Sequence, residues 1–215
     1  MIPSATSPAA LLDIGALVAT TAMRDPFEYL IVPGFVRAEA VAAASRDFPH
    51  IARCGSFPLK SLRYGAAFGA LVEALTSAPV AELLSEKLGV DVEGRPTMVT
   101  VRGRTGPRDG FIHTDSATKI VTMLVYLNEP WEAKGGRLRL LRSAGDLDDY
   151  AAEVPPERGT MLAFRRSDRS FHGHQPFTGE RRSLQINWMT DRAVMRREEL
   201  RHRFSARLKQ LSPFA

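Results

Sequence analysis

The sequence predicts an α+β fold in which helices cover an antiparallel β body of the sandwich or jelly-roll kind. Apolar residues recur at helical spacing over residues 36–93, and after Pro96 the pattern changes to short β-type runs separated by Gly, Pro and Asp. The chain has 215 residues and 44% hydrophobic content, which is enough for one sizeable core. It contains no repeat or low-complexity linker, so we expect one domain over 1–215, with a mainly helical part over 24–95, a β part over 96–190 and a C-terminal helix over 191–215.

The helical part begins with a short strand and turn in "FEYLIVPGF", where Pro33 and Gly34 end the strand. Three helices are predicted after it, from "RAEAVAAASRDF", "AAFGALVEALTS" and "VAELLSEKLG". The second is expected to end near Pro79 and the third at Gly89, because these residues interrupt helical geometry.

The β part consists of seven short runs with turn residues between them. They are "TMVTVRG", "GFIHTD", "KIVTMLVYLN", "GRLRLL", "GTMLAF", "RSFHGHQPF" and "RSLQINWM". Strands of this length and spacing are typical of a jelly roll.

The composition indicates a reducing compartment, such as the cytoplasm. The single cysteine, Cys54, excludes an internal disulfide. The first 23 residues lack a basic segment and carry Asp13 within their most apolar part, so we expect no secretory signal. No apolar run has transmembrane length, and no membrane partner is expected.

The formal charge is +5, with a pI of about 9.7, and much of the excess lies in "DRAVMRREELRHRFSARLK". This run is typical of an amphipathic helix whose charged face is solvated, because Val194, Leu200, Phe204 and Leu208 would form its apolar face. No helix-turn-helix, zinc finger or stacking-aromatic module accompanies the charge, so the sequence disfavours a nucleic-acid partner.

Candidate metal ligands occur on two of the β runs. His113 and Asp115 are two positions apart, so in a strand both side chains leave the same face. A third ligand must come from elsewhere, and His172 and His174 in "RSFHGHQPF" are the candidates. Two histidines and one carboxylate on one face of a metal leave three positions open, an arrangement suited to Fe(II) that binds a cosubstrate and dioxygen.

An iron site of this kind takes two electrons from a 2-oxo acid, whose distal carboxylate needs a cationic anchor. Arginine suits this role because its planar fork makes two parallel hydrogen bonds. In "GERRSLQINW", alternation places Arg182 on the face of Leu184, Ile186 and Trp188, and Arg181 on the face of Ser183, Gln185 and Asn187. We expect the apolar face to be the interior one, which favours Arg182 as the anchor and leaves Arg181 as the alternative.

The segments "HTD", "TMLVYLNEPWEAKGGRLRLL", "SFHGHQP" and "RRSLQINW" together resemble the catalytic core of the 2-oxoglutarate and iron(II) dependent dioxygenases, in the prolyl-hydroxylase-like branch. The resemblance covers roughly residues 99–190, and the joint order of the motifs is more specific than any one of them. It implies a double-stranded β-helix whose mouth holds the iron. It also implies Fe(II), 2-oxoglutarate and dioxygen as cofactors and cosubstrates, with ascorbate as a further candidate.

The resemblance implies a metal triad of His113, Asp115 and His172, in which His172 stands four residues before Pro176 as the family's ligand does. It implies that Arg182, six residues before a tryptophan, binds the C5 carboxylate of 2-oxoglutarate. The interval from His172 to Arg182 is one residue longer than in the hypoxia-sensing relatives, which keeps Arg181 open.

Three further residues match positions around the cosubstrate. Tyr126 matches a tyrosine whose hydroxyl shares the C5 carboxylate, Leu138 an apolar residue lining the pocket, and His174 a position beside the cosubstrate. The family's usual tyrosine on the strand before His-x-Asp is replaced here by the run "VRGRTG", so polar contacts differ at that place.

The expected activity is hydroxylation of an unactivated C–H bond, with succinate and CO₂ as coproducts. The substrate is a small molecule or a peptide, and Arg102, Arg104 and Arg108 near the entrance would suit an acidic one. The alternative is a cupin-like metal-binding protein or a zinc hydrolase, which would share the triad but need no buried arginine. A nucleic-acid demethylase would carry a second arginine six residues after the anchor, where Trp188 stands.

Overall fold

The computed structural model describes residues 8–198 and residue 200. Its helices are α1 (Pro8–Leu11), α2 (Ile14–Ala19), α3 (Ala38–Arg46), α4 (Ala66–Leu75) and α5 (Ala78–Leu88), with a 3₁₀ turn at Leu59–Ser61. Its strands are β1 (Tyr29–Val32), β2 (Phe57–Pro58), β3 (Thr97–Thr105), β4 (Lys119–Tyr126), β5 (Leu138–Leu141), β6 (Tyr150–Val154), β7 (Met161–Arg165), β8 (His172–Gly173) and β9 (Gly179–Met189).

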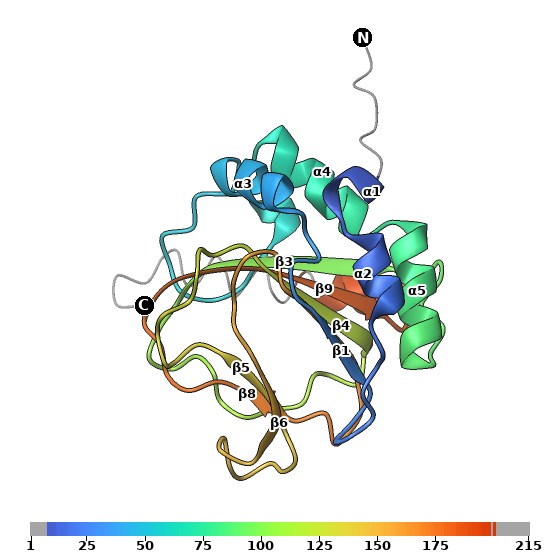
Figure 1. Cartoon of the computed structure of the whole chain (residues 1–215), viewed down its shortest axis with the longest axis vertical. Coiled ribbons are helices and arrows are strands. Elements are labelled where there is room, and N and C mark those ends of the chain that lie inside the picture. Colours follow the sequence, from blue (N-terminus) through green and yellow to red (C-terminus); the bar gives the residue numbers. More distant parts are fainter. Residues whose placement is uncertain (1–7, 199, 201–215) are drawn as a thin grey trace.

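The strands form two antiparallel sheets that face each other (Figure 1). The large sheet has the order β1-β7-β4-β9-β3-β2, and the small sheet has the order β6-β5-β8. Neighbours in the large sheet are distant in the sequence, because the chain crosses repeatedly from one sheet to the other. This arrangement confirms the predicted α+β class with a jelly-roll core.

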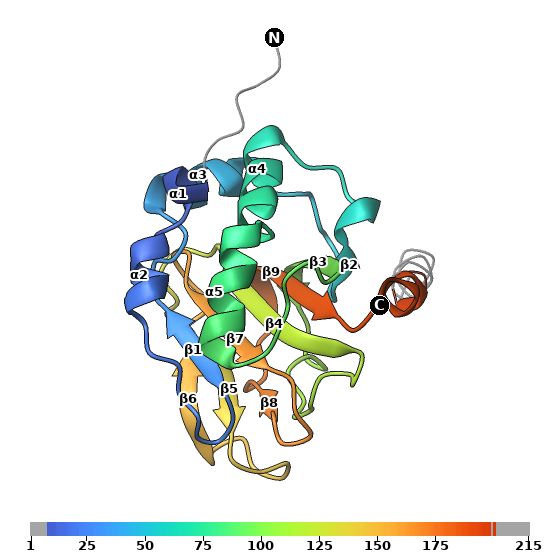
Figure 2. The same ribbon diagram turned by 90° about the vertical axis from the view of Figure 1, so that its right-hand side faces the viewer.

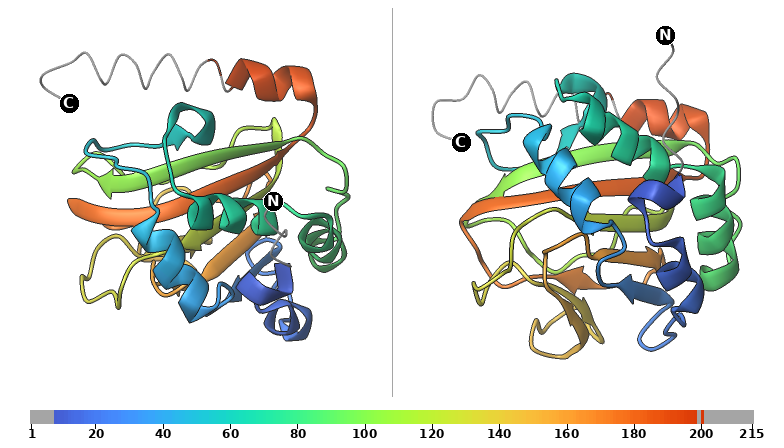
Figure 3. Two further views of the ribbon diagram at one scale, coloured as in Figure 1. Left: turned by 90° about the horizontal axis from the view of Figure 1, so that it is seen from above. Right: turned by 45° about the horizontal axis from the view of Figure 1, so that its top comes forward.

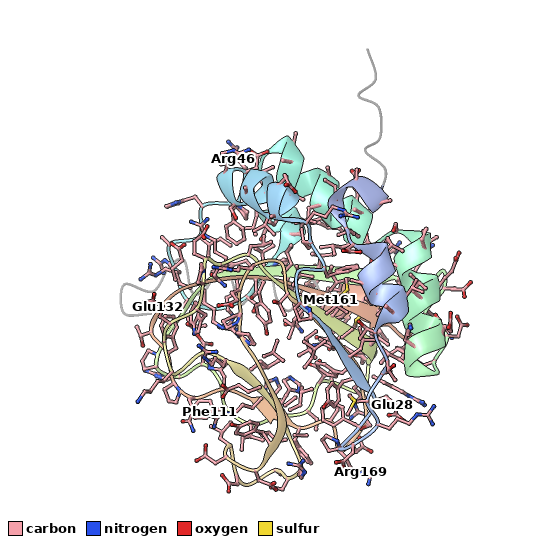
Figure 4. All side chains as sticks on the ribbon, in the orientation of Figure 1. Glu28, Arg46, Phe111, Glu132, Met161 and Arg169 are labelled. Atoms are coloured by element: carbon pink, nitrogen blue, oxygen red, sulfur yellow. The ribbon has the colours of Figure 1, made fainter. Side chains whose placement is uncertain are left out.

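The helices cover the outer face of the large sheet (Figures 1 and 2). Apolar side chains at alternate positions of β4, namely Val121, Met123 and Val125, lie in this layer with α4 and α5 side chains. Met161 of β7, labelled in Figure 4, is fully buried in the same layer. The three helices predicted over residues 36–93 are thus α3, α4 and α5.

A second apolar layer lies between the two sheets. It contains Phe27, Tyr29, Tyr126, Leu138, Leu140, Val154, Leu162 and Phe164. Strands β4 and β9 therefore have both faces buried, one under the helices and one inside the jelly roll. Side chains on the face of β4 and β9 that lies inside the jelly roll can reach a site between the two sheets, and those on the face under the helices cannot.

Two of the predicted β runs are mostly irregular. "GFIHTD" forms only an isolated bridge at His113, and "RSFHGHQPF" forms the two-residue strand β8. The elements α1, α2, β2 and β6 were not predicted from the pattern. Residues 192–198 are helical and follow β9 (Figure 3), while the remainder of the predicted C-terminal helix, apart from residue 200, lies outside the described residues.

Within the part of the chain that the structure describes, no single helix is long and apolar enough to cross a membrane. Helices α4 and α5 reach that length and composition only together, across a bend of 41°. Their apolar residues, among them Phe68, Leu71 and Leu84, are buried in the layer over the large sheet.

Candidate active site

The two irregular segments meet at the open side of the jelly roll and bring His113 beside His172. The backbone N–H of His113 donates to the carbonyl of His172 at 3.1 Å, and the N–H of His172 donates back at 3.0 Å. The centroids of their imidazole rings are 4.4 Å apart. A reciprocal pair of backbone bonds therefore sets the distance between two residues that are far apart in the sequence.

Asp115 completes a cluster with these histidines. One ligand atom from each of His113, Asp115 and His172 lies within 4.8 Å of the other two, a spacing that suits a single metal ion. Asp115 and His172 are buried, while His113 is exposed, so the cluster is open on one side. His174 is not part of the cluster, although it stands two positions after His172.

Backbone carbonyls orient both imidazoles. Nδ1 of His113 lies 2.8 Å from the carbonyl oxygen of Phe111, and Nδ1 of His172 lies 3.0 Å from that of Ser170. When each Nδ1 carries the proton and donates to its carbonyl, Nε2 is left to bind the metal. Histidine ligands usually make such a hydrogen bond through the ring nitrogen that does not bind the metal. Burial lowers the pKa of His172 to about 4, so this ring is neutral at physiological pH. The ring of Phe111 is 72% exposed and lies at the outside of the molecule (Figure 4).

The carboxylate of Asp115 is held from two sides. Lys119 Nζ contacts Oδ1 and the Thr122 hydroxyl donates to Oδ2, each at 2.5 Å. Burial raises the pKa of Asp115, but Lys119 and His172 outweigh this and hold it below its ordinary value. The Thr122 oxygen also lies 3.0 Å from Oδ1 of Asn187. The carboxylate is thus ionised and fixed in orientation, as a metal ligand must be.

We expect Thr122→Val to weaken Fe(II) binding by about 10- to 100-fold, the usual cost of losing an outer contact to a ligand. The reason is that Asp115 would lose the donor that fixes Oδ2. Titration of the metal-free protein with Fe(II) under anaerobic conditions measures the effect.

Thr105→Val is the matched control, because Thr105 is fully buried and its hydroxyl has no hydrogen-bond partner among the described residues. Equal Fe(II) affinities of the Thr122→Val variant and the unmodified protein would contradict the role given to Thr122.

The cluster lies at the wall of a cavity of about 120 Å³ between the two sheets. The cavity is lined by His113, Thr122, Leu124, Tyr126, Leu138, His172, His174 and Arg181, together with Ser56, Thr100, Arg102, Gly110, Gly173, Ser183 and Gln185. This volume is well below the roughly 300 to 1,000 Å³ of pockets for drug-sized ligands, so the cavity suits a small, polar molecule.

Arg181, and not Arg182, points into this cavity. Arg181 is only 5% exposed, its Nε donates to the carbonyl of Gly136 at 2.8 Å, and its guanidinium carbon lies 5.1 Å from the centroid of the Tyr126 ring. No acidic side chain of the described residues forms an ion pair with it. Burial lowers the pKa of Arg181, and an unpaired buried guanidinium calls for an anionic ligand.

The expectation that Arg182 is the inward arginine is wrong. Its side chain lies on the helix side of the large sheet, where Nε contacts Glu180 at 2.9 Å and Nη1 donates to the Ser45 carbonyl at 3.3 Å. Alternation divided β9 correctly into two faces. However, the apolar face of β9 is buried under the helices, and its polar face, with Ser183, Gln185 and Asn187, lies on the interior side of the jelly roll. The assumption that the apolar face lines the interior is therefore incorrect.

The other candidate residues, Tyr126, Leu138 and His174, all line the same cavity. The Tyr126 hydroxyl is buried and makes no well-aligned hydrogen bond among the described residues, although Arg181 is close to it; burial raises its pKa, and Arg181 opposes this shift. Burial, followed by the nearby Arg181, lowers the pKa of His174 to about 4, so its ring is neutral. An unpartnered hydroxyl and an unpaired guanidinium at one end of the cavity fit the carboxylate of a dicarboxylic acid such as 2-oxoglutarate.

Gly110 allows the two irregular segments to approach each other. It accepts a backbone hydrogen bond from His174 at 2.9 Å and has φ of +99°, a region that side chains disfavour. A Cβ atom there would lie 2.5 Å from both Nδ1 and the carbonyl oxygen of His174. Only glycine fits at this point without displacing His174.

We expect Gly110→Ala to lower the free energy of unfolding by about 2 to 4 kcal/mol, because it combines backbone strain with overlap against a backbone atom. Gly94→Ala is the control: Gly94 has φ of +62°, but a Cβ atom there would have no neighbour within 4 Å, so strain alone should cost about 1 to 2 kcal/mol. Urea unfolding of both variants measures the difference, and equal losses would mean that the approach at Gly110 is not tight.

The sequence analysis did not identify Lys119 and Thr122, the two residues that contact the carboxylate of Asp115. A signal for Thr122 was present, because it is a polar residue in the apolar run "KIVTMLVYLN" and shares the interior face with Leu124 and Tyr126. Lys119 gave no comparable signal, since a lysine at the start of a strand is usually solvated.

The fold and the cluster define the class of protein: a jelly roll with two histidines and one aspartate for a mononuclear metal, facing a cavity with a buried arginine. A sequence model described as "2OG-Fe(II) oxygenase superfamily" matches residues 104–190, the segment that contains this site. No curated protein matches the chain by sequence.

Solved structures with a similar fold include a Pseudomonas putida prolyl-4-hydroxylase, at 18% identity and a TM-score of 0.52, covering 89% of this chain and 99% of that one. A viral collagen prolyl hydroxylase from Paramecium Bursaria Chlorella virus-1, in a 2OG complex, has 16% identity and a TM-score of 0.52, covering 75% and 96%. A Trichoplax adhaerens prolyl hydroxylase, in complex with a hypoxia inducible factor oxygen degradation domain peptide fragment, has 18% identity and a TM-score of 0.53, covering 83% and 86%.

Residues 104–190 thus match the 2OG-Fe(II) oxygenase superfamily, and the fold of the chain is similar to that of prolyl-4-hydroxylases. The match indicates an oxygenase that uses Fe(II) and 2-oxoglutarate, and the matched segment contains His113, Asp115 and His172, which could hold the metal ion.

Proposed function

We propose that the enzyme is a hydroxylase that inserts one oxygen atom of dioxygen into an unactivated C–H bond of its substrate. The second oxygen atom is incorporated into succinate as 2-oxoglutarate loses CO₂, so that substrate, 2-oxoglutarate and dioxygen give hydroxylated substrate, succinate and CO₂. The observation that carries this proposal is the buried Arg181, which has no acidic partner among the described residues and lines the same cavity as His113 and His172. Asp115 completes the cluster beside this cavity.

In this proposal, His113, Asp115 and His172 hold Fe(II), which supplies the activation of dioxygen when it is bound together with 2-oxoglutarate. Arg181 binds the C5 carboxylate through its planar fork. Tyr126 donates its otherwise unpartnered hydroxyl to the same carboxylate, which replaces the buried orphan with a charge-assisted hydrogen bond.

The remaining walls of the cavity position the cosubstrate and exclude water. Leu124 and Leu138 supply apolar contact to its carbon chain, and neutral His174 lies beside Arg181. Exclusion of water strengthens the interaction between Arg181 and a carboxylate, because fewer competing dipoles surround it.

Two alternatives fit less well. A cupin-like metal-binding protein or zinc hydrolase would share the triad but would have no use for the buried Arg181. A nucleic-acid demethylase of the superfamily would have a second arginine six residues after the anchor. With Arg181 as the anchor, that position is Asn187, which contacts Thr122.

The experiment is an assay of succinate formation by the purified protein, first stripped of metal with a chelator. Succinate should form only when Fe(II), 2-oxoglutarate and dioxygen are all added, and Zn(II) in place of Fe(II) should give none. Restoration of a hydrolytic activity by Zn(II), without any succinate from Fe(II), would support the zinc hydrolase instead.

We also propose that residues 1–215 form one domain for this reaction, since the helices bury the outer face of the sheet that carries the site.

A further inference from the structure

A second guanidinium, that of Arg102, lines the same cavity as Arg181. Arg102 is on β3 and is paired with Ser183 of β9, and a register shift separates this pair from the next one, Arg104 and Glu180. Arg181 lies in this irregular part of the ladder, and both guanidinium groups face the cavity. Burial is the main cause of the lowered pKa of Arg181, and the positive charge of Arg102 lowers it further.

Asp109 and Ser56 contact the guanidinium of Arg102. Its Nη1 lies 2.8 Å from Oδ1 of Asp109, and its Nη2 donates to the Ser56 hydroxyl at 3.2 Å. The other oxygen of Asp109 accepts a hydrogen bond from the backbone N–H of Gly106 at 2.8 Å, which fixes the carboxylate in the loop. Asp109 and Ser56 thus position the guanidinium.

Most of the hydrogen-bonding capacity of Arg102 remains unused. A guanidinium has five N–H bonds. Among the described residues only Ser56 takes an aligned hydrogen bond from it, and the buried Nη1 has no aligned acceptor although it is close to Asp109. The side chain is 22% exposed, so a ligand can reach the part of the guanidinium other than the buried Nη1.

The charges of the cavity leave room for a second anion. Asp115 is paired with Lys119, and Asp109 is the one carboxylate at Arg102 among the described residues. When Arg181 has bound the C5 carboxylate and the opposite end of 2-oxoglutarate lies at the metal, an unsaturated guanidinium remains at Arg102.

We propose that Arg102 binds a carboxylate of the substrate, so that the enzyme hydroxylates a small carboxylic acid at a carbon close to that group. This inference rests on the proposed function and adds the substrate class to it. A residue within a peptide chain, other than aspartate or glutamate, presents only neutral amides near its reacting carbon, and these would leave Arg102 with its donors unsaturated. The fork of a guanidinium matches a planar carboxylate, and the small cavity accommodates a compact acid.

The test compares matched compounds. Free L-amino acids and other small carboxylic acids, their carboxamides, their phosphate-bearing analogues and internal peptides of the same residues are incubated with enzyme, Fe(II) and 2-oxoglutarate. Mass spectrometry then records any gain of one oxygen. We expect hydroxylation of at least one free acid, and at least tenfold lower kcat/KM for its carboxamide. Hydroxylation of peptides or carboxamides as efficient as that of the acids, preference for the phosphate analogues, or no hydroxylation of any acid would overturn the proposal.

Arg102→Gln connects the preference to this residue. It should weaken binding of the preferred acid at least tenfold, measured by calorimetric titration of protein loaded with Mn(II) and 2-oxoglutarate, and should raise the KM for 2-oxoglutarate less than threefold. A larger effect on 2-oxoglutarate than on the acid would assign Arg102 to the cosubstrate and overturn the proposal.

Two further variants keep the test decisive. Arg108→Gln, in the loop that follows β3 and with an exposed side chain, should change both values less than twofold. Arg102→Lys retains the positive charge but not the planar guanidinium. Its affinity for the acid should lie between those of Arg102→Gln and Arg108→Gln. Succinate formation in the absence of any acid tests the proposed function separately, because Arg181 and the triad suffice for it.

Discussion

Replacing Arg181 by glutamine raises the KM for 2-oxoglutarate by roughly 30-fold to several thousandfold, because loss of a buried charged partner costs about 2 to 5 kcal/mol of binding. Arg181 is 5% exposed and has no acidic partner among the described residues, so a bound carboxylate is the group that completes its interactions. The measurement is succinate formation as a function of 2-oxoglutarate concentration.

Arg182→Gln is the matched control, since it makes the same change one residue further along β9. Its side chain is 31% exposed, pairs with Glu180 and lies over the Phe48 ring, on the other face of the sheet. Exposed ion pairs contribute about 0 to 1 kcal/mol, so the KM should change less than about threefold, and any loss should be in stability. A larger KM effect in Arg182→Gln than in Arg181→Gln would reverse the assignment of the two arginines.

Replacing His172 by alanine should abolish stoichiometric Fe(II) binding and succinate formation. His172 contributes one of three ligand atoms that lie within 4.8 Å of one another. Loss of an outer contact alone typically costs 10- to 100-fold in affinity, and loss of a ligand should cost more than about 100-fold. Metal analysis after dialysis and the succinate assay measure the two effects.

His174→Ala is the control for this variant, because His174 is a buried cavity-lining histidine two positions away that is outside the cluster. It should retain Fe(II) within about threefold, whatever its effect on 2-oxoglutarate, since it lacks any ligand role. Loss of iron in His174→Ala, with retention in His172→Ala, would mean that the wrong histidine of the pair has been assigned to the metal.

Helices α3, α4 and α5 could be predicted from the sequence because helical periodicity is a strong local signal. The His-x-Asp pattern and the resemblance to the family predicted that His113, Asp115 and His172 lie together, and the three residues form a cluster. The direction of Arg181 and Arg182 could not be predicted in the same way. Alternation shows which residues share a face, but both faces of β9 are buried, and only the placement of the helices shows which one lines the cavity.

The contacts that tune the site depend on long-range packing for the same reason. The reciprocal backbone bonds between His113 and His172 join two segments that do not form regular strands, so neither segment shows the pairing in its own pattern. Thr122 meets Asp115 and Asn187 only after β4 and β9 have paired in the large sheet. Such contacts follow from the register of the sheet, which the sequence alone does not reveal.

The most direct test of the central claim is an anaerobic titration of the Fe(II)-loaded protein with 2-oxoglutarate, followed by the visible absorption band that arises when a 2-oxo acid chelates Fe(II). The band should saturate at one 2-oxoglutarate per iron, be absent in His172→Ala, and require far higher 2-oxoglutarate in Arg181→Gln than in Arg182→Gln. A band of unchanged midpoint in Arg181→Gln, or no band in the unmodified protein with iron bound, would contradict the account.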